Sequence, residues 1–179
     1  MNRISIQYVK IPFGELIIGS FNNQLCICDW RYRKMRTEID KRIQNGLNAS
    51  YFEENSETIQ LTIQQLNEYT NGEREIFNVP LNFIGTDFQK EVWNELLKIP
   101  FGETETYLGL SKKMNKEKAI RAVASANGAN AISIIVPCHR IIGSNGKLVG
   151  YAGGLNVKNK LLQLESKNKQ NKQLNLFND

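Results

Sequence analysis

The hydrophobic pattern of this 179-residue chain changes from a period of two to a helical period, and this change constrains the fold more than any other feature. Residues 4–9, 14–19 and 24–30 are short, rich in apolar residues and separated by turn residues, which predicts three antiparallel strands. Apolar residues then recur at helical spacing over 35–45 and 56–69. The sequence therefore predicts an α/β fold of the α+β kind that begins with an antiparallel sheet and helices.

The segment Pro80–Gly85 is the predicted boundary between two domains. A chain of this length can hold one domain or two small ones. We expect an N-terminal α/β support domain over 1–80 and a mainly helical domain over 81–165. The Lys/Asn/Gln-rich residues 166–179 are expected to be a disordered tail.

Two short helices in the second half form a helix-turn-helix candidate. Thr86 and Gln89 have the spacing of a capping box, which opens a helix that Pro100 ends. Helices are then predicted over 107–114 and 117–126, joined by a short connector. The second of these is rich in alanine, and small side chains allow a helix to approach a DNA groove or to pack tightly inside the protein.

Charge and cysteine usage narrow the class of protein. The formal net charge is +5, and its excess lies in the second half: residues 81–165 hold eleven Lys or Arg and seven Asp or Glu, against nine and ten over 1–80. A basic second half suits a polyanionic partner. No run of 18 apolar residues occurs, so we expect no membrane span and a cytoplasmic location. The odd number of cysteines, three, argues against a disulfide framework.

Cys26 and Cys28 alternate on a predicted strand and are interpreted as buried small apolar residues. A Cys-x-Cys pair could instead begin a zinc site, but His139 is the only histidine and no second cysteine pair completes four ligands. We therefore expect no metal.

The chemical centre is Cys138, which precedes the only histidine of the chain. A thiolate is a strong nucleophile, and an adjacent imidazole can take the thiol proton. Residues 132–136 predict a strand that Pro137 ends, and His139 can serve Cys138 only if the backbone turns there or a water molecule bridges them. From this dipeptide alone, the alternative interpretation stays open that Cys138 is a buried, unreactive cysteine beside a structural histidine.

The residues after this centre predict a hairpin over 141–149, with Asn145–Gly146 as a type I′ turn. A glycine-rich loop, Gly150–Gly154, follows and allows close approach of the backbone to a ligand. The last helix is predicted over 156–165.

Residues 85–165 resemble the O6-alkylguanine-DNA alkyltransferases, a family also called methylated-DNA–protein-cysteine methyltransferases. The match keeps order and spacing over almost half the chain, and its most specific motif is Pro137-Cys138-His139-Arg140. The other matching motifs are Gly85-Thr86, Phe88-Gln89, Val92-Trp93, Ile99–Glu103, Tyr107, Arg121–Val123, Asn130, Gly150-Tyr151, Gly153-Gly154 and Glu165. The resemblance implies a C-terminal domain with a winged-helix-like helix-turn-helix.

The resemblance also implies catalytic roles. Cys138 is expected to accept the alkyl group, with His139 drawing its proton through a water and Glu165 orienting His139. Tyr107 is expected to protonate the leaving guanine. Arg121 is expected to fill the space that the extruded nucleotide leaves in the base stack.

A second implied set contacts the DNA. Asn130 is expected to brace the strand before the cysteine, and Arg140 to belong to this DNA-binding set. Backbone groups near Cys138 and Ile141 are expected to bind the guanine edge. Tyr151 is expected to wall the pocket, and the amide of Ala152 to bind the base. Many members have Ser at this last position and Pro after the asparagine, where this chain has Ala. A side-chain hydroxyl contact is therefore not expected here, and the zinc of some members has no ligand set in this chain.

The implied reaction is irreversible, stoichiometric repair of double-stranded DNA that contains O6-alkylguanine, with O4-alkylthymine as a further candidate. We expect base flipping, no cofactor, and a monomer without an obligate protein partner. Two alternatives stay open at this point: a cysteine hydrolase that uses Cys138 and His139 over many turnovers, and a non-catalytic DNA reader. Relatives of the second kind replace the reactive cysteine, which is intact here.

Overall fold

The computed structural model describes residues 2–176 and the side chains up to residue 170. Its first half is a four-stranded sheet with the order β3-β2-β1-β4. The strands β1 (Asn2–Ile11), β2 (Gly14–Phe21) and β3 (Gln24–Trp30) are antiparallel neighbours, as predicted, whereas β4 (Ala49–Glu53) pairs parallel with β1 and was not predicted.

Two helices accompany this sheet: α1 (Arg36–Leu47) and α2 (Glu57–Thr70), close to their predicted ranges. Alternate residues of β2 point to opposite faces, because side chains alternate along a strand. Ile17 packs with Ile39 of α1, and Leu16 packs in a larger cluster with Leu66 of α2 and with the second half of the chain. The sheet is thus covered on both faces.

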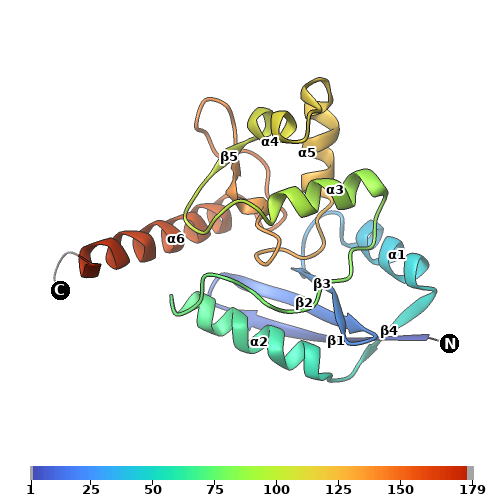
Figure 1. Ribbon diagram of the computed structural model, residues 1–179. Helices are drawn as coiled ribbons and strands as arrows, with labels where there is room; N and C mark the ends of the chain where they lie inside the picture. Colours follow the sequence, from blue (N-terminus) through green and yellow to red (C-terminus); the bar gives the residue numbers. More distant parts are fainter. Residues whose placement is uncertain (1, 177–179) are drawn as a thin grey trace.

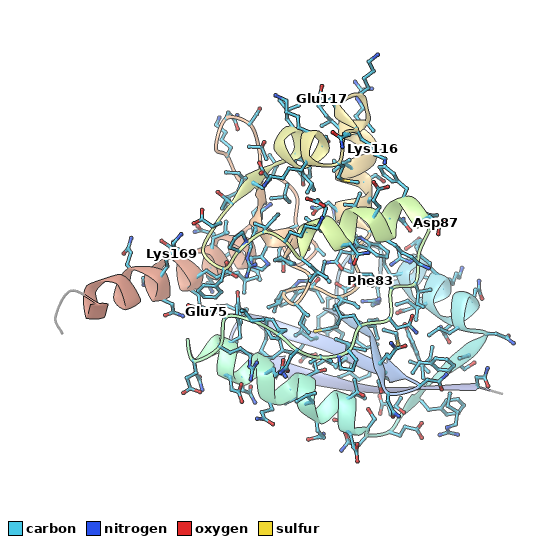
Figure 2. The ribbon with its side chains drawn as sticks, viewed as in Figure 1. Glu75, Phe83, Asp87, Lys116, Glu117 and Lys169 are labelled. Carbon is cyan, nitrogen blue, oxygen red and sulfur yellow. The ribbon has the colours of Figure 1, made fainter. Side chains whose placement is uncertain are left out.

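The second half is mainly helical, as predicted: α3 (Asp87–Leu96), α4 (Tyr107–Lys113), α5 (Ile120–Gly128) and α6 (Leu155–Leu176). Figure 1 shows α3, α4 and α5 stacked above the sheet, with α6 extending to one side. The predicted capping box is confirmed, because Thr86 Oγ1 accepts from the amide of Gln89 and Gln89 Oε1 accepts from the amide of Thr86. In Figure 2, Asp87 marks this start of α3.

The edge strand β3 joins the two halves. The amide of Leu25 donates to the carbonyl of Pro80 at 2.8 Å, and the amide of Cys28 donates to the carbonyl of Ala131 at 2.9 Å. The amide of Ser133 donates back to Cys28 at 2.7 Å. Backbone from the start of the helical half and from its middle, just after α5, therefore satisfies the edge of the sheet, which would otherwise be open to pairing with another chain.

Three sequence predictions were wrong. Residues 132–136 form turns with one isolated bridge rather than a strand, because their backbone groups bond locally and to β3. No hairpin forms over 141–149: β6 (Ile141–Ile142) pairs parallel with β5 (Glu105–Thr106). A type I′ turn is also absent, since of Asn145 and Gly146 only Gly146 has a positive φ, +75°.

The third error concerns the tail. Helix α6 continues through residues 166–176, where disorder was expected, and residues 177–179 lie outside the described part. The extension has no Gly or Pro to end it, and its first turn contacts the body of the protein. Lys169, labelled on α6 in Figure 2, pairs with Glu103, and Asn168 lies close against Gly72. Among the described residues, no helix is both long and apolar enough to cross a membrane.

Candidate active site

Two consecutive tight turns present Cys138. The amide of Ile135 donates to the carbonyl of Ser133 at 2.9 Å, which closes a γ-turn around Ile134 with φ +70°. The amide of Cys138 donates to the carbonyl of Val136 at 2.8 Å, with Pro137 at φ −81° and ψ 59°, the values of an inverse γ-turn. A β-branched residue with positive φ is strained, and such strain persists only where surrounding contacts enforce it.

Asn130 is the side chain that ties these turns together. Its Nδ2 lies 3.2 Å from Cys138 Sγ and 3.0 Å from the carbonyl oxygen of Val136. Its Oδ1 accepts from the amide of Ile132 at 2.9 Å. The asparagine thus both braces the segment before the cysteine, as predicted, and donates a hydrogen bond to the sulfur.

A buried charge cluster of the first half, made of Asp29, Arg33 and Arg36, holds the backbone at Asn130. The fully buried carboxylate of Asp29 accepts from Arg33, Arg36 and Ser133 at 2.9, 2.9 and 3.0 Å. Arg33 also donates to the carbonyl of Asn130 at 2.9 Å and to that of Gly128 at 2.6 Å. Because the carboxylate has several charged donors, its burial is compensated.

His139 is held by Glu165, and both side chains are fully buried. Nε2 of His139 lies 2.8 Å from Glu165 Oε1, which also accepts from Tyr69 Oη at 2.8 Å and Arg140 Nη2 at 3.0 Å. The second carboxylate oxygen accepts from Arg140 Nε at 2.9 Å and from the amide of Gly102 at 3.1 Å. Nδ1 of His139 has no described partner. A proton on Nε2 satisfies the carboxylate and leaves Nδ1 as a free acceptor.

Burial is the largest cause of the pKa shifts of Cys138, His139 and Tyr107. Burial raises the pKa of Cys138, and the hydrogen bond from Asn130 opposes that rise. Burial lowers the pKa of His139, so its imidazole is neutral near pH 7. Burial, and then a Cys138 thiolate, raises the pKa of Tyr107, whose hydroxyl stays protonated. The surroundings of Cys138 therefore favour the thiol, and its proton must leave before the sulfur can act as a thiolate.

A cavity of about 640 Å³ opens onto Cys138. One wall comes from the glycine-rich loop, one from α4 and α5, and one from the loop after β3 in the first half. The residues that line it are Tyr32–Met35, Tyr107, Ala124, Asn127, Gly128, Asn130, Cys138 and Gly150–Gly154. The cavity volume falls in the range of small-molecule sites. Cys138 is the one cysteine among the lining residues.

The other predicted site residues lie in three different places. Tyr151 and Ala152 line the cavity, whereas Arg121 is exposed on the first turn of α5 and forms no ion pair with a described residue. Arg140 and Ile141 are buried and are not part of the cavity lining. The guanidinium of Arg140 is occupied by Glu165 and by the carbonyl of Ile99, which argues against the expected DNA contact.

The helix-turn-helix candidate consists of α4, a short 3₁₀ turn at Glu117–Ala119, and α5. Lys116 and Glu117 lie at its tip in Figure 2, on the side away from the sheet. Lys112 and Lys118 are exposed there. Among the described residues, no group of three His, Cys, Asp or Glu side chains is placed to hold a metal ion.

Comparison with known proteins agrees with this geometry. Residues 4–83 match the ribonuclease-like domain, and residues 87–167 the DNA binding domain, of 6-O-methylguanine DNA methyltransferase. A methylated-DNA–protein-cysteine methyltransferase of Methanosarcina acetivorans is 54% identical over 155 residues, covering 86% of this chain and 93% of that protein. That of Methanosarcina barkeri is 41% identical over 160 residues, 89% and 96% of the two chains.

The chain belongs to the methylated-DNA–protein-cysteine methyltransferase family. Its fold is also that of Mycobacterium tuberculosis OGT in a crystal structure of that protein with DNA. The TM-score is 0.78 at 37% identity, and the match covers 93% of this chain and 94% of the other.

Sequence reasoning missed what the first half contributes to the site of this family member. Tyr32 and Arg33 line the cavity, and Tyr69 of α2 binds the carboxylate that holds the histidine. The signal for Arg33 was weak: it lies four residues after Asp29 at the end of an apolar strand. No local pattern marks Tyr69, whose partner is 96 residues away.

Proposed function

We propose that this protein repairs DNA by moving an alkyl group from the O6 atom of guanine to the sulfur of Cys138, once per molecule. The observation that carries the proposal is the cavity that opens onto one cysteine: Cys138 Sγ accepts a hydrogen bond from Asn130, and beside it lies a buried histidine with a free nitrogen. Membership of the family supports the same reaction.

The thiol proton leaves toward Nδ1 of His139, through a water molecule since no direct hydrogen bond joins the two side chains. Glu165 fixes the imidazole and stabilises its charged form. The sulfur lone pair then attacks the alkyl carbon, and the carbon–oxygen bond breaks with its electron pair on the guanine. The product is a thioether, which water does not hydrolyse under mild conditions, so turnover stops after one event.

Tyr107, which also lines the cavity, completes the exchange. Its hydroxyl, kept protonated by burial, donates to the departing guanine and lowers the barrier to its release. The imidazolium of His139 then loses its proton to solvent, and the Tyr107 phenolate takes one back, which restores both side chains. The net change is one thiol hydrogen exchanged for one alkyl group.

The target base must leave the duplex before it can reach a buried sulfur, which costs a few kcal/mol of unstacking. The exposed Arg121 is proposed to enter the vacated space, and Lys112 and Lys118 to bind phosphates beside it. We propose that residues 81–165 act as the DNA-binding and acceptor domain and that residues 1–80 support it. We also propose that the protein works as a monomer in the cytoplasm, with O4-alkylthymine as a second substrate.

A titration tests the proposal. Protein is added to duplex DNA containing O6-methylguanine, and intact-protein and peptide mass spectrometry follow the methyl group. We expect one equivalent of repair, a mass gain of one methyl group on the peptide with Cys138, and none in Cys138→Ala, which should still bind DNA. Repair beyond one equivalent would favour the hydrolase, and a gain on Cys26 or Cys28 would place the acceptor elsewhere.

A further inference from the structure

Lys158 is a fully buried lysine that the reaction above does not use. It lies in the first turns of α6, and its Nζ donates to the carbonyl of Val149 at 2.8 Å and to that of Gly150 at 3.2 Å. Burial of an ammonium group is costly unless it gains polar partners or an opposite charge. Two carbonyl groups supply the partners, but no described carboxylate lies within ion-pair distance of Lys158.

The carbonyl groups that Lys158 binds begin the glycine-rich loop of the cavity. Gly150 has φ +44°, a backbone conformation suited to glycine, and the loop continues through Tyr151 and Ala152 along the cavity wall. The lysine therefore connects a rigid helix to the wall that faces Cys138. Its first effect is to fix that wall.

The charges of Lys158 and of a Cys138 thiolate affect each other's pKa. Burial lowers the pKa of Lys158 to about 8, and a thiolate at Cys138 raises it. Conversely, the ammonium group lowers the pKa of Cys138 and of His139. Of the other charges that act on the sulfur, Asp29 opposes the thiolate and Arg33 favours it. A thiolate at Cys138 is therefore a negative charge that favours this buried cation, which has no carboxylate partner among the described residues.

We propose that Lys158 is a positioning residue with two linked tasks: it anchors the loop at Val149 and Gly150, and its positive charge stabilises the thiolate of Cys138 as it forms. This inference rests on the proposed function, because it concerns the same sulfur. Near pH 7 Lys158 is protonated, and it transfers nothing in the reaction. It acts in the low-dielectric interior, where a fixed charge has a larger effect than in water.

Three variants separate the two tasks. Lys158→Gln keeps hydrogen-bond donors for the loop but removes the charge, Lys158→Met removes both, and Lys160→Gln removes an exposed charge from the same helix as a control. The readout is the pH dependence of Cys138 alkylation by iodoacetamide, mapped by peptide mass. We expect Lys158→Gln to slow alkylation about tenfold below pH 8, where Lys158 is charged, which corresponds to a shift of about one unit in the apparent pKa of the thiol. Well above pH 8, where the lysine is neutral, the variant should match the wild type.

The control should match the wild type. Lys158→Met should show the same shift and, in addition, a larger loss with free O6-benzylguanine, because the loop that binds the base is no longer anchored. An unchanged pH profile in a folded Lys158→Gln variant overturns the electrostatic task. Equal rates of Lys158→Gln and Lys158→Met with O6-benzylguanine overturn the anchoring task.

A second measurement does not depend on the folding of Lys158 variants. The midpoint of Lys158 is followed by NMR on lysine-labelled protein, in the wild type and in Cys138→Ser. Coupling between two sites is reciprocal, so loss of the ionisable sulfur should lower the Lys158 midpoint. Identical midpoints overturn the proposal. If these tests fail while wild-type protein still gains a methyl group on Cys138, only the role of Lys158 falls; if no methyl group is gained, the proposed function falls.

Discussion

Replacing Glu165 with glutamine tests whether a single buried carboxylate holds His139, the proposed proton acceptor, in place. The carboxylate is fully buried and accepts hydrogen bonds from His139, Tyr69, Arg140 and the amide of Gly102. In Glu165→Gln the guanidinium of Arg140 loses its counter-ion while it stays buried. Removal of one partner from a buried ion pair costs roughly 3–5 kcal/mol of the free energy of unfolding.

The pKa of Glu165 leads to a similar magnitude. Burial opposes ionisation, but His139 and Arg140 more than compensate and lower the pKa from 4.5 to about 2. A shift of this size corresponds to roughly 3 kcal/mol in favour of the folded state. Because the folded pKa lies below the unfolded one, this stabilisation is complete above pH 4.5 and is lost as the pH falls through 2.

Urea unfolding at several pH values measures the effect. We expect Glu165→Gln to be about 3–5 kcal/mol less stable near neutral pH, and the difference from wild type to narrow by about 2 kcal/mol between about pH 6 and pH 3. Tyr69→Phe is the matched control, since it removes one donor from the same carboxylate and should cost about 2 kcal/mol. Equal losses in the two variants, or a difference that does not depend on pH, would refute the idea that the ionised carboxylate holds the cluster.

Three further predictions concern catalysis and the cavity. Arg121→Ala should slow repair in duplex DNA by more than about tenfold yet leave the reaction with free O6-benzylguanine unchanged, because only the duplex requires extrusion; equal loss on both substrates contradicts this role. Tyr107→Phe should slow methyl transfer about 100-fold in single-turnover assays without loss of DNA affinity, as expected for removal of a general acid, and an unchanged rate would exclude it. Gly153→Ala should place a Cβ 2.6–2.8 Å from the buried indole of Trp30 and destabilise the loop by about 1–3 kcal/mol. Thermal unfolding measures this loss of stability, and the rate with O6-benzylguanine measures its effect on the cavity. A Gly153→Ala variant with full stability and full activity would show that the indole can move.

Local chemistry decided the parts of the fold that the sequence predicted. The three antiparallel strands follow from alternation, and the start of α3 follows from the capping pair Thr86 and Gln89, whose partners are three residues apart. The acceptor motif was recognisable because a proline, a cysteine and the single histidine are adjacent. Such features need only neighbouring residues to form, so the sequence reveals them.

Errors arose where distant partners overrode local preference. The β-branched run at 132–136 favours a strand, yet Asn130, Asp29 and the edge of β3 hold it in strained turns around Ile134. The extension of α6 beyond residue 165 looked too polar to be ordered, but its first turn contacts the loops at Gly72 and Gly102. In both cases tertiary contacts supply the free energy that local propensity lacks.

The sequence alone indicated the groups that we propose take part: a sulfur, an imidazole beside it, a phenol and a guanidinium on a helix of small residues. Only the tertiary structure decided how they are tuned. Burial raises the pKa of Cys138, and the charge of Lys158 opposes that rise. Tyr69 and Gly102 complete the hydrogen bonds of Glu165. Desolvation and long-range charge depend on residues that are far apart in the chain, and no local pattern encodes how folding brings them together.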